Sequence, residues 1–189
     1  MVIDRNFFDF FQRADSHNHL FEMPFAIDKK TLYVVPSYSI ESINKVLALK
    51  DTRSFLLAVG IAPQEVVFNG FKASDFEKVA DIIRKNKKHI SAIGEIGLDF
   101  HYAKLPEHIN EMIKLFEYQL SLAEELSVPV LVHSRKAEAK ISEIISSYKV
   151  KGLMHAFGGT LVQAQAMVES GFLISVPPLK SKERKKNSQ

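Results

Sequence analysis

The chain has 189 residues, of which 46% are hydrophobic and 25% charged, a composition typical of a soluble globular protein with room for one well-packed domain. It has no cysteine, which excludes disulfides, thiol catalysis and cysteine-bound zinc. No apolar run is long enough to predict a membrane span, and residues 1–15 lack the uncharged core of a signal peptide. A cytoplasmic protein without membrane partners is therefore expected.

The formal net charge of +3 is unevenly distributed along the chain. The last ten residues contain five Lys or Arg and one Glu, so their net charge is +4. Because the whole chain carries +3, residues 1–179 together carry −1. We therefore expect a single domain over 1–179 and a basic, disordered tail over 180–189. The positive balance does not predict a general affinity of the domain for nucleic acid.

Seven short apolar runs, rich in β-branched residues, alternate with amphipathic segments. Because the runs are apolar on both faces, they predict buried parallel strands rather than half-exposed antiparallel ones. Their ranges are 14–20, 31–37, 55–62, 91–100, 128–134, 152–157 and 171–176.

Helical periodicity fills the intervals between these runs. The longest predicted helix lies within residues 105–127, where one stripe of side chains is apolar. Ser74 and Thr160 are predicted N-caps of two further helices, and Gly171 is a predicted C-terminal stop. The apolar stripe of the longest helix consists of Ile109, Met112, Ile113, Phe116, Leu120 and Ala123.

The regular alternation of strand and helix predicts an α/β fold with a parallel sheet. Seven strands exceed what most small doubly wound sheets carry, and they indicate a TIM-type (β/α) barrel. Barrels of this type place their active-site side chains at the C-terminal ends of the strands. Polar residues near those ends are therefore the first candidates for function.

Metal-competent side chains recur on four of the predicted strands. His17 and His19 lie two apart in the first run, so that both imidazoles would leave the same face of a strand. Glu95 lies in the fourth run, His133 near the end of the fifth and His155 in the sixth. Neutral imidazoles with a carboxylate suit zinc, manganese or iron, and a carboxylate can bridge two ions.

Each of these histidines also has a simpler interpretation. A lone histidine in a strand is usually a satisfied core residue, and we expect His89, His101 and His108, which lie beside charged residues, to be solvated. Four strands that each carry such a side chain favour one shared site. Glu95 supports this, because an ionised carboxylate among Ile and Gly is costly to bury unless it is paired or metal-bound.

Five segments, in order, resemble one family, the TatD-type metal-dependent deoxyribonucleases. They are DSHNHL (15–20), GEIGLDF (94–100), PVLVHSRKA (129–137), MHAFGGT (154–160) and GFLISV (171–176). The resemblance implies a distorted TIM barrel of the amidohydrolase type. It also implies a metal-dependent hydrolase of phosphodiester bonds whose substrate is DNA, attacked near a free 3′ end.

The same resemblance implies roles for the clustered side chains. His17 and His19 would bind one metal ion, His133 and His155 would bind a second, and Glu95 would bridge the two. Two divalent cations (Mg²⁺, Mn²⁺ or Zn²⁺) lower the pKa of a shared water and clamp the oxygens of an in-line displacement at phosphorus. Glu95, His133 and His155 are accordingly the predicted catalytic residues.

Arg135 follows His133 by two residues and has two interpretations. Its planar guanidinium could fork onto a phosphate oxygen of the substrate. It could equally be an ordinary surface arginine with little energetic effect. The sequence alone favours neither.

The chain departs from the family pattern in two places. The family commonly has G-x-H-P at the end of strand 3, whereas this chain reads GIAPQE with Ala62 at the histidine position, which puts one contact to substrate or water in doubt. The family's eighth strand carries an Asp that binds a metal and activates the attacking water. After GFLISV this chain continues with VPP and the basic segment, and no Asp follows Asp99.

The sequence therefore predicts an incomplete barrel of about seven strands without strand 8, and three accounts of it stay open. The chain is a fragment of an enzyme, one half of a split enzyme completed by a second chain that supplies strand 8, or a degenerate relative without catalysis. Two alternative functions also stay open. These are an inactive binding remnant and a metal-dependent hydrolase of small amides or esters.

Overall fold

A computed structural model describes residues 9–22 and 27–176 of the chain. Seven parallel strands form one sheet, in which each strand pairs with its neighbours in chain order. The predicted α/β architecture with a parallel sheet is thereby confirmed. The strands are β1 (Arg13–Asp15), β2 (Thr31–Pro36), β3 (Phe55–Ala58), β4 (Ile90–Asp99), β5 (Val130–Arg135), β6 (Gly152–His155) and β7 (Phe172–Ile174).

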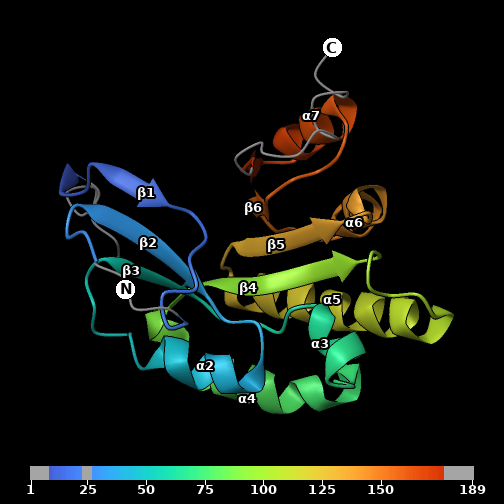
Figure 1. Cartoon of the computed structure of the whole chain (residues 1–189), viewed down its shortest axis with the longest axis horizontal. Coiled ribbons are helices and arrows are strands. Elements are labelled where there is room, and N and C mark those ends of the chain that lie inside the picture. Colours follow the sequence, from blue (N-terminus) through green and yellow to red (C-terminus); the bar gives the residue numbers. More distant parts are fainter. Residues whose placement is uncertain (1–8, 23–26, 177–189) are drawn as a thin grey trace.

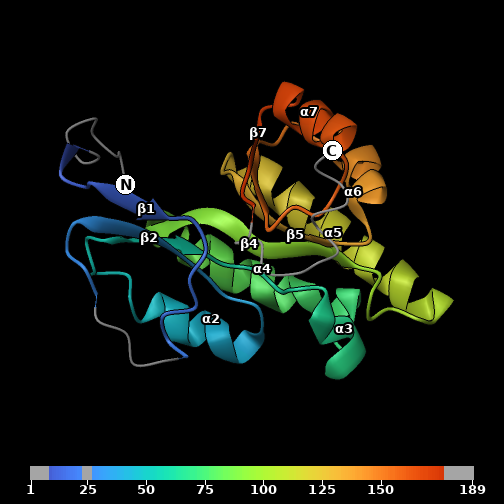
Figure 2. The same cartoon turned by 45° about the horizontal axis from the view of Figure 1, so that its top comes forward.

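The sheet curls as part of a TIM-type barrel, with β1 and β7 at its two edges (Figures 1 and 2). Helices α2, α4 and α5 lie under β2 to β4 (Figure 1), and α6 and α7 lie beside β5 to β7 (Figure 2). The helices are α2 (Ile40–Leu47), α3 (Gln64–Phe68), α4 (Phe76–Lys85), α5 (Pro106–Leu126), α6 (Glu138–Ile145) and α7 (Leu161–Glu169), with short 3₁₀ turns η1 (Ala73–Asp75) and η2 (Lys87–His89).

The main apolar core lies between the sheet and its helices. Ile96 and Leu98 of β4 are fully buried in one cluster with Phe116 and Leu120 of α5. All six side chains of the predicted α5 stripe are buried in this cluster or pack against it. Full burial of a large apolar side chain such as Phe116 contributes roughly 1.5–3 kcal/mol, so the packing of α5 holds the strand that carries Glu95 in place.

One predicted helix start is confirmed and one is wrong. The Thr160 hydroxyl accepts a hydrogen bond from the backbone N–H of Gln163, whose side chain bonds back to Thr160, which makes a capping box for α7. Ser74 instead lies inside η1, and the residue that precedes α4 is Asp75. The chain enters α4 through a 3₁₀ turn, so the hydroxyl of Ser74 is one residue too early to cap this helix.

Several strands are shorter than the apolar runs that predicted them. β1 ends at Asp15 and β7 at Ile174. None of the helices in the described ranges is long and apolar enough to cross a membrane. The basic segment 180–189 lies outside the described residues.

Candidate metal centre

The first two histidines lie in a loop and not on a strand. Because β1 ends at Asp15, the prediction that His17 and His19 leave one face of a strand was wrong. Asp15 shapes the loop: its carboxylate accepts hydrogen bonds from the backbone N–H of His17 at 3.2 Å and from the side-chain amide of Asn18 at 2.7 Å. The loop still brings the two rings together, with their Nε2 atoms 3.0 Å apart.

Glu95 reaches the histidines through an irregularity in β4. The register between β4 and β5 shifts between Gly94 and Ile96, so Glu95 has no partner residue in β5. Its backbone N–H donates instead to the carbonyl oxygen of Ser37 at 2.8 Å. Glu95 is only 7% exposed, so its carboxylate needs partners inside the protein.

Strands β5 and β6 supply the other two histidines. His133 and His155 are register partners across these strands, and partners in parallel strands present their side chains to the same side. The ring of His155 stacks on that of His17, with the centroids 3.6 Å apart. The five residues predicted as metal ligands therefore converge at one end of the sheet.

The two oxygens of Glu95 face different histidines. Oε2 lies 3.5 Å from Nε2 of His17 and 3.6 Å from Nε2 of His19, whereas Oε1 lies 3.0 Å from Nδ1 of His133. Ligand atoms placed tetrahedrally at 2.0–2.1 Å from an ion are separated from one another by roughly 3.3 Å. The separations among His17, His19 and Glu95 are close to this value, so these three residues fit one cation.

Unpaired ring nitrogens also fit a cation at this position. Nδ1 of His19 donates to the carbonyl oxygen of Pro36 at 3.1 Å, which leaves the lone pair of Nε2 facing the cluster. In the described part of the chain, the buried Nδ1 atom of His155 has no hydrogen-bond partner, although buried polar atoms are normally satisfied. Imidazoles with one carboxylate are a donor set that suits zinc and related divalent ions.

The charges in the cluster favour metal-binding protonation states at three residues. Burial, together with the nearby histidines, lowers the pKa of His17 to about 4 against the attraction of Glu95. Burial also lowers the pKa of His155. Burial alone would raise the pKa of Glu95, but His133 and His17 lower it to about 2. At neutral pH the two imidazoles are therefore neutral and the carboxylate is ionised.

His133 behaves differently because it lies between two carboxylates. Burial alone would lower the pKa of His133, but the hydrogen bonds with Asp99 and Glu95 raise it to about 9. In the metal-free protein His133 is thus an imidazolium at neutral pH. Because a metal ligand must be deprotonated, a cation that binds to His133 has to displace a proton.

Comparison with known proteins assigns the chain to a family. The family described as TatD related DNase matches residues 14–189 of the chain. The chain belongs to the TatD family. A protein of Methanocaldococcus jannaschii, named an uncharacterized metal-dependent hydrolase, is 32% identical over 178 residues, which cover 88% of this chain and 68% of the relative. Human deoxyribonuclease TATDN3 is 36% identical over 107 residues, or 55% of this chain and 39% of the relative.

Solved TatD structures share the fold. The crystal structure of the TatD homologue YjjV of Escherichia coli K12 matches with a TM-score of 0.77 and 27% identity, covering 91% of this chain and 72% of the other. A TatD family hydrolase of Entamoeba histolytica matches with a TM-score of 0.67 and 17% identity, covering 88% and 65%. The chain spans 39% to 68% of the length of the two curated relatives above.

This TatD chain has two further polar residues at His133 that the sequence did not single out. Asp99, fully buried at the end of β4, places Oδ2 3.0 Å from Nε2 of His133. Gln64 of α3 donates from Nε2 to the same oxygen at 3.1 Å. The sequence could have indicated Asp99, because it is a carboxylate at the end of a predicted buried strand. No local pattern marked Gln64, which lies two residues beyond Ala62, the position where the family pattern has histidine.

A cavity of about 650 Å³ opens beside the histidine cluster. The expectation that His101 is solvated was wrong, because this residue is half-buried, its Nδ1 is buried and it lines the cavity. Arg135 is exposed; its guanidinium lies 5.3 Å from the ring centroid of Tyr102 and donates to the Tyr102 hydroxyl at 3.4 Å. Other lining residues include His133, Lys136, Glu138 and His155.

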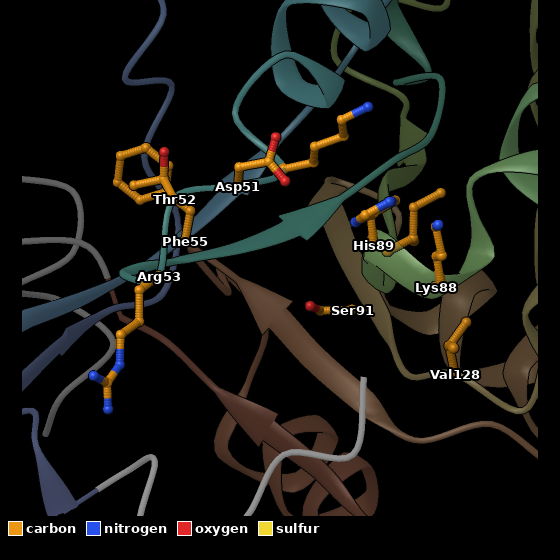
Figure 3. A pocket seen from close by; sticks show the side chains of 10 residues that line it. Asp51, Thr52, Arg53, Phe55, Lys88, His89, Ser91 and Val128 are labelled. Atoms are coloured by element: carbon orange, nitrogen blue, oxygen red, sulfur yellow. The ribbon is translucent and has the colours of Figure 1, made fainter.

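A second cavity, of about 420 Å³, lies at the opposite ends of the strands. Its lining comes from the segments that precede β3, β4 and β5, and it includes Lys50, Arg53, Lys88 and His89. Figure 3 shows Lys88 and His89 on one side of the cavity and Arg53 on the other. Because Arg53 and Lys88 lie on opposite sides of the cavity, their charges do not meet at a common point for an anion.

Proposed function

We propose that the protein is a divalent-metal-dependent hydrolase of phosphodiester bonds that acts on DNA from a free 3′ end. The observation that carries this proposal is the division of the Glu95 carboxylate, whose Oε2 faces His17 and His19 while Oε1 faces His133. A carboxylate in this position suits a bridge between two ions. Relatives named as metal-dependent hydrolases and as a deoxyribonuclease support the assignment.

In this proposal His17 and His19 would hold one divalent ion, His133 and His155 would hold a second, and Glu95 would bridge the two. Ions of this kind activate water and neutralise the charge that develops on phosphate oxygens during displacement. The metal is Mg²⁺, Mn²⁺ or Zn²⁺. Burial keeps His17 and His155 neutral, so that their nitrogens are available as ligands.

Arg135 is the proposed contact to a substrate phosphate. Its guanidinium stands at the cavity beside His133 and is held over the ring of Tyr102. A planar guanidinium forms two parallel hydrogen bonds with a phosphate, which a lysine ammonium does not. Lys136 lines the same cavity and adds to its positive charge.

The purified protein tests this proposal with DNA labelled at the 3′ or the 5′ end. We expect nucleotides to be released from the 3′ end in the presence of Mg²⁺, Mn²⁺ or Zn²⁺, with no release in EDTA. Glu95→Gln and His133→Ala should abolish release, whereas His108→Asn, a histidine outside the cluster, should not change it. Turnover of small amide or ester substrates with DNA left intact would replace the DNA assignment with a small-molecule hydrolase. No turnover of any of them would indicate an inactive barrel.

A further inference from the structure

We propose that Asp99, assisted by Gln64, is a positioning residue that fixes the tautomer and orientation of the His133 imidazole for metal binding. Neither residue belongs to the group of candidate metal ligands. The inference rests on the proposed metal-binding function of that group, and it explains how one of the ligands is prepared. It is carried by the hydrogen bonds of a single buried carboxylate.

The Asp99 carboxylate is anchored by the loop that follows β4. Its Oδ1 accepts hydrogen bonds from the backbone N–H groups of His101 at 3.0 Å and Tyr102 at 3.3 Å. The residue is fully buried, so water cannot replace these bonds if the carboxylate rotates. Oδ2 is therefore held at a fixed position that faces β5.

Oδ2 is committed to two donors. Nε2 of His133 lies 3.0 Å from it and the side-chain amide nitrogen of Gln64 lies 3.1 Å from it. An ionised carboxylate only accepts hydrogen bonds, and an amide NH₂ only donates them. The carboxylate thus keeps a proton on Nε2 of His133. The amide nitrogen of Gln64 also lies 3.1 Å from this ring nitrogen, but two N–H donors do not bond to each other, so Gln64 acts through its hydrogen bond to Oδ2 of Asp99.

The consequence appears at the other ring nitrogen. With Nε2 protonated, the lone pair of a neutral His133 lies on Nδ1, which is 3.0 Å from Oε1 of Glu95. Two electron-rich atoms at this separation require a proton or a cation between or beside them. The arrangement of carboxylate, imidazole and metal ion is a common way to orient a histidine ligand and increase its basicity.

Two other roles for Asp99 account for less of the geometry. A turn-capping role explains the bonds from His101 and Tyr102 but leaves the contacts of Oδ2 unexplained. A role as a direct metal ligand conflicts with the position of Oδ2, because it contacts the ring nitrogen of His133 that points away from Glu95.

The test compares the wild type with Asp99→Asn and Gln64→Leu in the zinc-loaded full chain. Zinc affinity is measured by competition with a chelator, and the protonated ring nitrogen is read from the imidazole ¹⁵N spectrum. We expect Nε2 of His133 to carry the proton in the wild type. In Asp99→Asn the amide NH₂ faces Nε2, the proton moves to Nδ1, and zinc affinity falls by roughly 10–100-fold. Gln64→Leu should lower it only a few-fold, because the carboxylate stays in place.

Thr31→Val is the matched control. Thr31 is also buried, and its hydroxyl donates to the carboxylate of Asp28 at 2.8 Å. It lies at the start of β2, whereas the histidine cluster lies at the other end of this strand. We expect this variant to lose stability without a change in zinc affinity or in the His133 spectrum. If Thr31→Val lowers zinc affinity as much as Asp99→Asn does, the loss in both variants comes from general destabilisation, and the positioning role is overturned.

The outcomes separate this inference from the proposed function. If the wild type binds no zinc, the metal-binding function is overturned and the inference fails with it. If the wild type binds zinc and Asp99→Asn binds it equally tightly with Nε2 still protonated, only the inference is overturned. Should Asp99→Asn not fold, the wild-type spectrum decides, because a proton on Nδ1 of His133 in the zinc-loaded protein excludes the positioning role.

Discussion

Gly97 of β4 and His133 of β5 are register partners whose backbones lie in close contact. A Cβ atom on Gly97 would lie 2.1 Å from the carbonyl oxygen of His133, far inside van der Waals contact. The φ angle of Gly97 is also positive, at 137°, a conformation that side chains with a Cβ rarely adopt. The absence of a side chain at position 97 therefore lets β5 bring His133 up to Glu95.

Gly97→Ala is expected to destabilise the protein and to displace His133. The steric clash and the positive φ together should lower the free energy of unfolding by about 3 kcal/mol, measured by urea denaturation. Gly70→Ala is the control, since Gly70 also has a positive φ but no neighbour within 4 Å of an added Cβ, and it should cost only about 1 kcal/mol. Equal losses in the two variants would show that the contact with His133 is not the cause.

Glu95→Gln should remove the stabilisation that a metal ion gives to the folded protein. A ligand at 100 times its Kd stabilises a protein by about 2.7 kcal/mol, so zinc should raise the Tm of the wild type. The variant loses the carboxylate whose two oxygens face the two groups of histidines. Its zinc affinity should fall by more than about 100-fold, because residues that only hydrogen-bond to metal ligands already contribute roughly 10–100-fold. Glu41→Gln, in an exposed pair with Lys45, should respond to zinc as the wild type does.

The stability of the metal-free protein should be greatest near pH 6.5. The folded-state pKa of His133 is raised from 6.5 to about 9, so its contribution is complete below pH 6.5 and is lost as the pH rises through 9. The pKa of His17 is lowered from 6.5 to about 4, so its contribution is complete above pH 6.5 and is lost as the pH falls towards 4. The loss on the alkaline side should be on the order of 3 kcal/mol.

Urea unfolding in EDTA between pH 4.5 and 9.5 measures this dependence. His133→Asn removes the titrating group between Glu95 and Asp99, so its stability should no longer fall between pH 6.5 and 9. A wild-type profile that is flat over this range would contradict the raised pKa of His133.

Arg135→Gln should weaken catalysis without weakening metal binding. A hydrogen bond to a charged group contributes about 1.5–3 kcal/mol, so kcat/KM for DNA should fall by roughly 10–100-fold, while zinc affinity stays constant. Tyr102→Phe keeps the ring under the guanidinium and loses only the 3.4 Å hydrogen bond, so its effect should be small. An unchanged kcat/KM in Arg135→Gln would show that Arg135 is an ordinary surface residue that does not contact the substrate.

The order and type of the main elements were determined by the sequence. Short runs that are apolar on both faces specify buried parallel strands, and the stripe from Ile109 to Ala123 specifies a helix with one buried face. These signals are local, since each depends on the periodicity of a few neighbouring residues. The residue types at the ends of the runs likewise indicated a metal site containing His17, Glu95 and His133.

Only the tertiary structure decided how these residues meet. The hydrogen bonds of Asp15 place His17 in a loop, and the register shift at Glu95 depends on how β4 pairs with β5. The contacts of His133 with Asp99 and Gln64 join residues 34 and 69 positions apart in the chain. Such contacts follow from strand register and sheet curvature, which are fixed by the packing of the whole domain and leave no periodic trace in the sequence around either partner.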